Sequence, residues 1–207
     1  MYQQAYTPWK WHQELFDYAK ELNIPIFSTP FDKTAVDFLE DLNNPIMKIA
    51  SFELVDIPLI EYAASKGSPM IMSTGIATLD EIQDAVDACR KVGNNDITLL
   101  KCTSSYPAPL SEANLMTIPD MAKRFDCKVG LSDHTTGDVG ACTAVALGAS
   151  VIEKHFIIDR SIGGPDSAFS MNKEEFSIMV KRIRQTEECL GTVSYELSEK
   201  MKNNRKW

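Results

Sequence analysis

The stretches GLSDHT at 130–135 and VIEKHF at 151–156 decide the fold of this chain. Each is an apolar run that ends in polar residues and carries a histidine at its tip. This pattern is typical of parallel strands whose carboxyl ends meet a functional site. If the two runs are neighbouring strands, His134 and His155 lie side by side.

Outward from these stretches, the chain alternates short apolar runs with amphipathic helical windows, the pattern of a parallel α/β sheet. We expect strands at 25–29, 46–50, 69–73, 97–103, 128–132 and 150–154. We expect helices at 10–22, 33–43, 57–66, 79–93, 117–125, 138–148 and 172–190. Capping-box spacings at Thr78–Glu81 and Asn172–Glu175 mark two of the helix starts.

The number of units limits the architecture. Six βα units can be counted, whereas a closed (β/α)8 barrel needs eight. An open sheet, a barrel with two strands hidden from the pattern, and a barrel without its first two units all fit this count. Residues 1–24 contain a helix but no strand, so missing units would precede Met1. No Ser/Gly linker interrupts the series, and we expect one domain over residues 1–207.

Composition excludes several classes of function. The chain has 44% hydrophobic and 24% charged residues, which is typical of a globular protein. Its net charge of -8 argues against non-specific binding to nucleic acid or to an acidic membrane. Five cysteines without a CxxC pair, and the lack of an apolar leader or long apolar run, predict a cytoplasmic protein with reduced thiols.

The polar residues at the strand ends favour a catalytic site. Every expected strand ends in hydroxyls or charges, and six such ends favour a site over ordinary turn chemistry. Lysines fall in or beside the strands at Lys48, Lys101 and Lys154. Each needs a partner, because an unpaired ammonium is costly inside an apolar strand. Serine residues stand at or just after the ends of four expected strands, at Ser51, Ser73, Ser104 and Ser132.

A lysine surrounded by hydroxyls favours a phosphate cradle around Lys48. The alternative is an imine-forming lysine of an aldolase, either Lys48 or Lys101. Taken singly, either strand-end histidine fits a core imidazole bonded to backbone. As a pair flanked by carboxylates, His134 and His155 instead favour a divalent metal with open positions for water and substrate oxygen. His12, in the helical WKWHQELF, is expected to be structural.

The carboxylates that flank this histidine pair are Asp133 and Glu153. The glycine-rich stretch DRSIGGPDSAFSMN at 159–172 is long enough to be a substrate loop. Asp166 is its carboxylate near the tip, and a turn-forming aspartate is the competing interpretation.

Together these motifs resemble the sialic acid synthase family, most closely its bacterial branch that makes pseudaminic acid. The matching segments are STPFD, KIASFE, STG, KCTSSYPAP, GLSDHT, VALGA, VIEKHF and GPDSAFS. The segments KCTSSYP, GGPDSAFS and TPWKWH favour the pseudaminic branch. The resemblance implies a TIM barrel followed by a small antifreeze-like domain. It also implies condensation of phosphoenolpyruvate with an open-chain N-acetylated sugar, release of phosphate, and a divalent metal, usually Mn2+.

The resemblance also implies roles for residues at the matching motif positions. The metal would be held by His134 and His155. The phosphate and carboxylate of phosphoenolpyruvate would be held by Lys48, Ser51, Ser73 and Ser132. The sugar would be contacted by Glu53, Tyr106 and Asp166. Ser104 stands where the neuraminate branch has asparagine, and would contact phosphate. The expected catalytic set is Lys48, Glu53, His134 and His155.

The sequence departs from the family at both ends, since the first two βα units and the antifreeze-like domain are absent from it. The chain therefore resembles an internal barrel fragment. Exposed barrel edges invite pairing, so we expect a homodimer or other self-association, and weak or no activity of the chain alone. The expected sugar is 2,4-diacetamido-2,4,6-trideoxyaltrose. The alternatives are an N-acetylneuraminate or legionaminate synthase, and a non-catalytic fragment that binds ligand or assembles with a partner.

Overall fold

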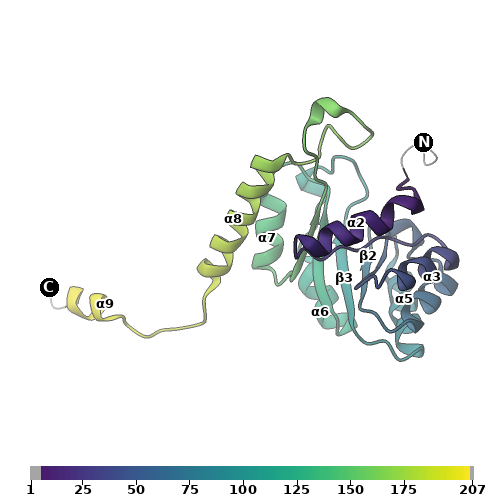
Figure 1. Ribbon diagram of the computed structural model, residues 1–207. Coiled ribbons are helices and arrows are strands. Elements are labelled where there is room, and N and C mark those ends of the chain that lie inside the picture. The colour runs from purple at the N-terminus through teal and green to yellow at the C-terminus, as the bar shows by residue number, and fades with distance from the viewer. Residues whose placement is uncertain (1–5, 206–207) are drawn as a thin grey trace.

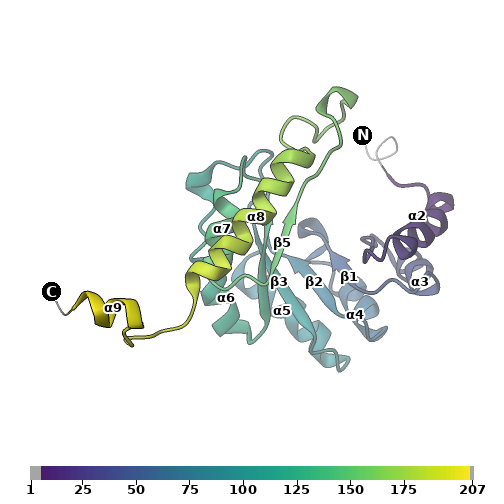
Figure 2. The ribbon, with the colours of Figure 1, turned by 60° about the vertical axis from the view of Figure 1, so that its left-hand side comes forward.

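A computed structural model describes residues 6–205, and its centre is one parallel sheet of five strands in the order β1-β2-β3-β4-β5 (Figures 1 and 2). The strands are β1 (Met47–Ile49), β2 (Met70–Ser73), β3 (Ile97–Cys102), β4 (Lys128–Asp133) and β5 (Val151–Lys154). Each of the first four strands is followed by a helix that returns the chain to the start of the next strand. All five carboxyl ends therefore share one edge of the sheet.

Helices precede, connect and follow the strands of this sheet. Two helices precede it, α2 (Trp9–Glu21) and α3 (Lys33–Asp41). The crossovers are α4 (Ile57–Ser65), α5 (Leu79–Lys91), α6 (Thr117–Phe125) and α7 (Val139–Ala146). The last two helices are α8 (Lys173–Leu190), which packs on α7, and α9 (Glu199–Asn204), which lies away from the sheet (Figures 1 and 2). Short 3-10 turns are η1 (Ser51–Glu53), η2 (Leu110–Glu112) and η3 (Arg160–Ile162). No helix between residues 6 and 205 is long and apolar enough to cross a membrane.

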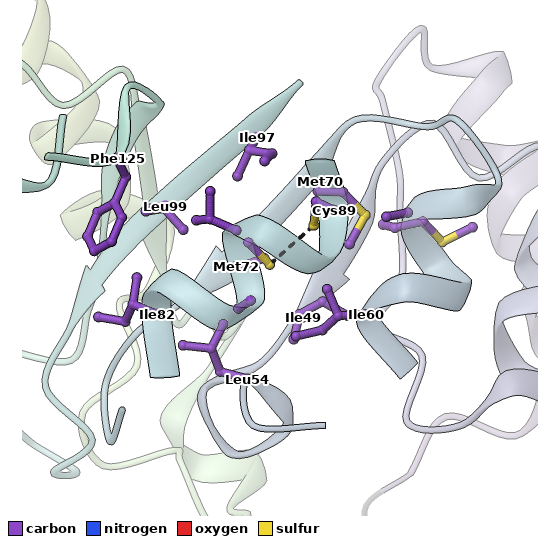
Figure 3. Close-up of a cluster of buried hydrophobic side chains, with 14 of the residues drawn as sticks. Ile49, Leu54, Ile60, Met70, Met72, Ile82, Cys89, Ile97, Leu99 and Phe125 are labelled. Carbon is purple, nitrogen blue, oxygen red and sulfur yellow. Dashed lines mark hydrogen bonds between the residues drawn. The ribbon is translucent and has the colours of Figure 1, made fainter. Parts of the chain in front are cut away.

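The hydrophobic core lies between the sheet and its crossover helices. Side chains of a strand point alternately to opposite faces, so Met47 and Ile49 of β1 face the helices. Figure 3 shows Met72 of β2 beside Cys89 of α5, whose sulfur atoms lie 4.0 Å apart. The intervening residue Lys48 consequently lies on the other face of the sheet.

The sheet is strongly curled. β1 and β5 are its two edge strands, separated by the other three. In a flat sheet, four strand spacings would place them about 19 Å apart. Lys48 Nζ of β1 instead lies 3.6 Å from Glu153 Oε2 of β5. Even with extended side chains, such a contact requires the sheet to bend into a half-barrel.

The structure confirms most of the predicted elements. All seven predicted helices form, and both capping boxes are present, at Thr78–Glu81 and Asn172–Glu175. The predicted strand at 25–29 is wrong, because this segment has neither helix nor strand structure. The Ser28 N–H donates to the side-chain oxygen of Asn44 at 3.1 Å. The flanking prolines, moreover, have no N–H to offer a ladder. Five strands, not six, make the sheet.

Candidate active site

A buried lysine lies in the middle of β1. Its neighbours on β1 pack into the core, which leaves Lys48 on the inner face of the curled sheet. Lys48 Nζ donates to Ser73 Oγ at 2.9 Å and to the Ile49 carbonyl oxygen at 3.0 Å. The side chain is only 6% exposed. Burial lowers the pKa of Lys48, while the carboxylate of Glu153 opposes this shift. Of the four serines predicted around Lys48, Ser73 contacts its ammonium directly, and Glu153 is a further partner.

Glu153 joins the two ends of the sheet. Its Oε1 accepts a hydrogen bond from Ser132 Oγ at 2.6 Å, while its Oε2 faces Lys48. The β4–β5 register pairs Ser132 directly with Glu153, which places both on the inner face. From the sequence, Glu153 is expected only as a carboxylate that flanks the histidine pair. A carboxylate inside an apolar strand, two residues before His155, is unusual. This position was the sequence signal that could have marked Glu153 as a site residue.

A cluster of small polar side chains surrounds Gly75. The Gly75 N–H donates to Ser51 Oγ at 3.1 Å, and Ser51 Oγ donates to Cys102 Sγ at 3.5 Å. Ser104 Oγ lies 3.8 Å from the same sulfur. A Cβ at residue 75 would lie 2.2 Å from Ser104 Oγ, 2.8 Å from Cys102 Sγ and 2.9 Å from Ser51 Oγ. Only glycine lets the backbone approach these groups so closely. We name Ser51, Gly75, Cys102 and Ser104 the hydroxyl cluster.

The two predicted histidines meet beside this cluster. The ring centroids of His134 and His155 are 5.2 Å apart in an edge-to-face arrangement. His134 Nδ1 lies 2.9 Å from the Thr103 carbonyl oxygen and 3.8 Å from Cys102 Sγ. A ring N–H directed at a carbonyl orients the imidazole and leaves Nε2 as an electron-pair donor. His155 Nδ1 lies 3.6 Å from Asp166 Oδ2.

The environments of the two imidazoles shift their pKa values in opposite directions. Burial by itself would lower the pKa of His134, but the contacts with Cys102 and the Thr103 carbonyl outweigh it and raise the pKa. Burial, reinforced by neighbouring His134, lowers the pKa of His155. His155 is thereby favoured as the neutral imidazole, the form that binds metals.

The two imidazoles can be compared with the ligands that a divalent metal ion requires. Residues 6–205 contain no group of three or more His, Cys, Asp or Glu side chains placed to hold a metal ion. Two oriented imidazoles are nevertheless suited to borderline divalent ions, with water and substrate oxygen as the remaining ligands. The residues present fit a metal held by two protein ligands, and the metal itself stays a prediction.

Aromatic side chains cover the histidines. The Tyr106 ring lies 4.3 Å from His134 and 6.0 Å from His155, centroid to centroid. Phe169 lies 5.0 Å from His155 and 5.7 Å from Tyr106. Phe169 comes from the glycine-rich loop and was not identified in the sequence analysis, although its segment was. Its packing brings that loop, with Asp166, against the site.

Glu53 has an unmet hydrogen-bonding capacity. It ends η1 and its Oε2 is buried, with no hydrogen-bond partner among the described residues. Burial raises the pKa of Glu53, while its own backbone N–H and Lys48 oppose the shift. A buried carboxylate oxygen of this kind favours a donor supplied by a ligand.

Two other residues considered from the sequence, Lys101 and His12, have structural contacts and lie apart from the site residues described above. Lys101 Nζ donates to the Cys102 carbonyl oxygen at 2.6 Å and to Thr103 Oγ1 at 3.2 Å, so it holds the end of β3. His12 is buried, with its Nε2 3.4 Å from Ser28 Oγ, as expected for a structural histidine. Direct contacts join most of the remaining predicted residues in two groups. One is Lys48 with Ser73, Glu153 and Ser132, and the other is the hydroxyl cluster with His134, His155, Tyr106 and Asp166.

Comparison with known proteins places this region in a family. The NeuB family model matches residues 1–195. Pseudaminic acid synthase from Helicobacter pylori is 49% identical over 207 residues, which cover 100% of this chain and 61% of that protein. N,N'-diacetyllegionaminic acid synthase from Campylobacter jejuni is 42% identical over 184 residues, which cover 88% of this chain and 55% of that protein. The chain thus spans about three fifths of the length of such curated relatives.

Solved structures agree with this placement. The N-acetylneuraminic acid (sialic acid) synthetase from Leptospira borgpetersenii matches with a TM-score of 0.91 and 32% identity, over 99% of this chain and 71% of that one. A truncated 3-deoxy-D-arabino-heptulosonate 7-phosphate synthase from Thermotoga maritima matches with a TM-score of 0.80 at 16% identity, which shows a likeness of fold alone. The curled sheet is therefore similar to part of the barrel in these synthases. The resemblance drawn from the sequence motifs is confirmed, and the chain belongs to the NeuB family.

Proposed function

We propose that this chain carries out, or forms the core of, a metal-dependent condensation of phosphoenolpyruvate with an open-chain N-acetylated amino sugar. The products would be a nonulosonic acid and inorganic phosphate. The observation that carries the proposal is the gathering of a buried ammonium, four serine hydroxyls and two facing imidazoles where the parallel strands end. The names of the relatives supply the substrate class. Pseudaminic acid synthase stands among them at 49% identity, so 2,4-diacetamido-2,4,6-trideoxyaltrose is the sugar to test first.

Lys48 suits the anionic substrate. Its ammonium is buried and bonded to a neutral hydroxyl, Ser73, so a phosphate or carboxylate can add a charge-assisted hydrogen bond. Such an anion would compete with Glu153 for Lys48 and free that carboxylate from its ion pair. Ser51, Ser104 and Ser132 offer further hydroxyls. Held at several points, phosphoenolpyruvate would present its methylene carbon in a fixed orientation, and positioning of this kind is a large source of rate acceleration.

The sugar would lie on the side of the histidines. Glu53, with its unsatisfied Oε2, is suited to accept a hydrogen bond from a sugar hydroxyl. Tyr106 and Asp166 border the same space through their contacts with the imidazoles. A divalent ion such as Mn2+, held by His134 and His155, would supply Lewis-acid polarisation of the aldehyde oxygen.

The reaction balances without a redox step. The methylene carbon of phosphoenolpyruvate forms a bond to the aldehyde carbon, and the aldehyde oxygen gains a proton. The enol carbon that becomes electron-poor takes up water, which loses a proton. The C–O bond to phosphate then breaks as the hydroxyl oxygen forms the carbonyl of the product, and the proton of that hydroxyl passes to the departing phosphate. Lys48 and the serines hold the leaving group throughout, so their charge and hydrogen bonds stabilise the phosphate as it departs.

The test is phosphate release from phosphoenolpyruvate by the purified chain with Mn2+, with acetamido sugars supplied one at a time. The proposal predicts release that requires sugar and metal and that falls strongly in His134→Ala. Lys66→Met, which changes an ion pair on the helical surface, serves as the matched control. A chain that binds phosphoenolpyruvate and Mn2+ but releases no phosphate with any sugar would refute turnover and favour a ligand-binding role.

One observation favours a second candidate. Burial lowers the pKa of Lys48, and a lysine with a lowered pKa is suited to form an imine with a carbonyl substrate. Borohydride added with substrate would then fix a covalent adduct on Lys48, detectable by mass spectrometry. Absence of an adduct during sugar-dependent phosphate release would eliminate this aldolase mechanism.

A further inference from the structure

A buried ion pair lies directly behind the two histidines, and the proposed reaction does not use it. Lys154 Nζ lies 2.8 Å from Asp133 Oδ2, and the two side chains are 2% and 1% exposed. Asp133 precedes His134 in the chain, and Lys154 precedes His155. We propose that Asp133 and Lys154 are positioning residues that fix the distance and orientation between His134 and His155. The inference rests on the proposed function, in which these imidazoles hold the metal.

The contacts of Lys154 tie one strand end to the other. Besides Asp133, its ammonium donates to the carbonyl oxygens of Thr135 at 2.5 Å and Gly137 at 3.1 Å. Lys154 thus holds the side chain that precedes His134 and the backbone that follows it, and it is itself bonded covalently to His155. A movement of one histidine relative to the other would have to break this set of charge-assisted bonds.

The direction of the pair excludes direct contact with substrate. The β4–β5 register sets Ser132 opposite Glu153 and Asp133 opposite Lys154. Since side chains alternate between faces, the first couple faces the inner side with Lys48 and the second faces the helices. The ion pair can therefore act on ligands only through the histidines that follow it.

The pair is held in a single arrangement. Asp133 Oδ1 accepts hydrogen bonds from the Thr135 N–H at 2.9 Å and from Thr135 Oγ1 at 2.8 Å. Helix α7 closes over it, and a Cβ at Gly140 would lie 3.3 Å from each Asp133 oxygen. A buried ion pair often adds little net stability compared with apolar side chains of equal volume. Its main physical effect here is a fixed geometry.

The test uses the small number of histidines in the chain, which is three. In protein labelled with 15N-histidine, Lys154→Met is expected to shift the ring signals of His134 and His155 and to leave His12 unchanged. Electron paramagnetic resonance of Mn2+ should show an affinity about tenfold or more below wild type, as for other residues that orient metal ligands. Lys154→Arg, which keeps the charge, should restore part of the affinity.

Lys66→Met is the matched control, because it removes a lysine paired with Asp37 and Glu40 on the helical surface. It should change neither the ring signals nor the Mn2+ affinity. A folded Lys154→Met protein with wild-type signals for His134 and His155 and wild-type affinity would overturn the inference.

Two further results separate the inference from the proposed function. If wild-type protein binds no Mn2+, the proposed metal-dependent reaction fails, whereas the ring signals still decide whether Lys154 positions the histidines. If Lys154→Met does not fold, Thr135→Val replaces it, because this variant removes one bond to Asp133 and keeps the ion pair. Smaller shifts confined to His134 and His155 would then support the inference, and unshifted signals would overturn it.

Discussion

Replacing Gly75 with alanine tests whether the hydroxyl cluster is assembled by close approach of the backbone. The new methyl group would lie under 3.0 Å from three atoms, the nearest being Ser104 Oγ at 2.2 Å. Ser51 and Cys102 are buried, so they have little room to move away. Residue 75 has no left-handed backbone conformation, so the damage comes from the clash itself.

The expected loss of stability in Gly75→Ala follows from overpacking by the added methyl group. An added methylene in a closely packed site costs about 1–3 kcal/mol of unfolding free energy. For a chain of this size, this corresponds to a melting temperature lower by about 2–12 °C. Displacement of one hydroxyl that binds an anion costs about 1.5–3 kcal/mol of binding free energy. The affinity for phosphoenolpyruvate should therefore fall about tenfold or more.

The assay is thermal denaturation together with calorimetric titration of phosphoenolpyruvate, for Gly75→Ala, Ser104→Ala and the double variant. Loss of Ser104 Oγ removes the closest clash, so the double variant should lose less stability than the sum of the two single changes. Strictly additive effects, with wild-type melting temperature and affinity in Gly75→Ala, would refute the reasoning.

Three further predictions concern the core, the metal and a helix cap. Phe125→Ala, at a side chain 2% exposed, should lower the unfolding free energy by about 3–5 kcal/mol in chemical denaturation. His155→Gln should weaken Mn2+ binding by at least about tenfold in a resonance titration, since changes to residues that merely orient ligands already cost that much. Hydrogen bonds from the Thr78 N–H and hydroxyl hold the pKa of Glu81 below its ordinary value of 4.5, so its stabilising effect is complete above that pH. This effect should be lost as the pH falls through the lowered folded pKa, and Glu81→Gln should abolish that part of the pH dependence.

Each of these predictions has its own control or contradicting result. A wild-type acid dependence of stability in Glu81→Gln would contradict the cap argument. Undiminished Mn2+ affinity in His155→Gln would remove this residue from the metal site. A loss below about 1 kcal/mol in Phe125→Ala would contradict its place in the core.

Local signals in the sequence sufficed for most of the fold. Helices cover one face of the strands and the other face lines the curled interior, so most strand residues are apolar and the strands stand out as short continuous runs. The caps at Thr78 and Asn172 involve residues only three positions apart, and a local pattern reveals them. The segment 25–29 has the same local appearance as a strand. A strand forms only with a paired neighbour, however, and that depends on distant parts of the chain.

The same distinction applies to the site. His134 and His155 were found because each ends an apolar run on a neighbouring strand. The contact of Glu153 with Lys48 joins the first and last strands of the sheet, and it exists only because the sheet curls. The role of Gly75 depends on side chains from two other segments. The local sequence can show that Glu153 is a carboxylate within an apolar run, but it cannot show which distant side chains Glu153 and Gly75 meet.

The central claim is that Lys48 and its hydroxyl neighbours bind phosphoenolpyruvate at the carboxyl edge of the sheet. The most direct measurement is calorimetric titration of phosphoenolpyruvate into wild-type protein, Lys48→Met and the surface control Lys66→Met. The account predicts saturable binding by wild type and Lys66→Met, and at least about tenfold weaker binding by Lys48→Met, because a charged hydrogen bond is lost. Equal affinity in all three proteins would contradict the claim.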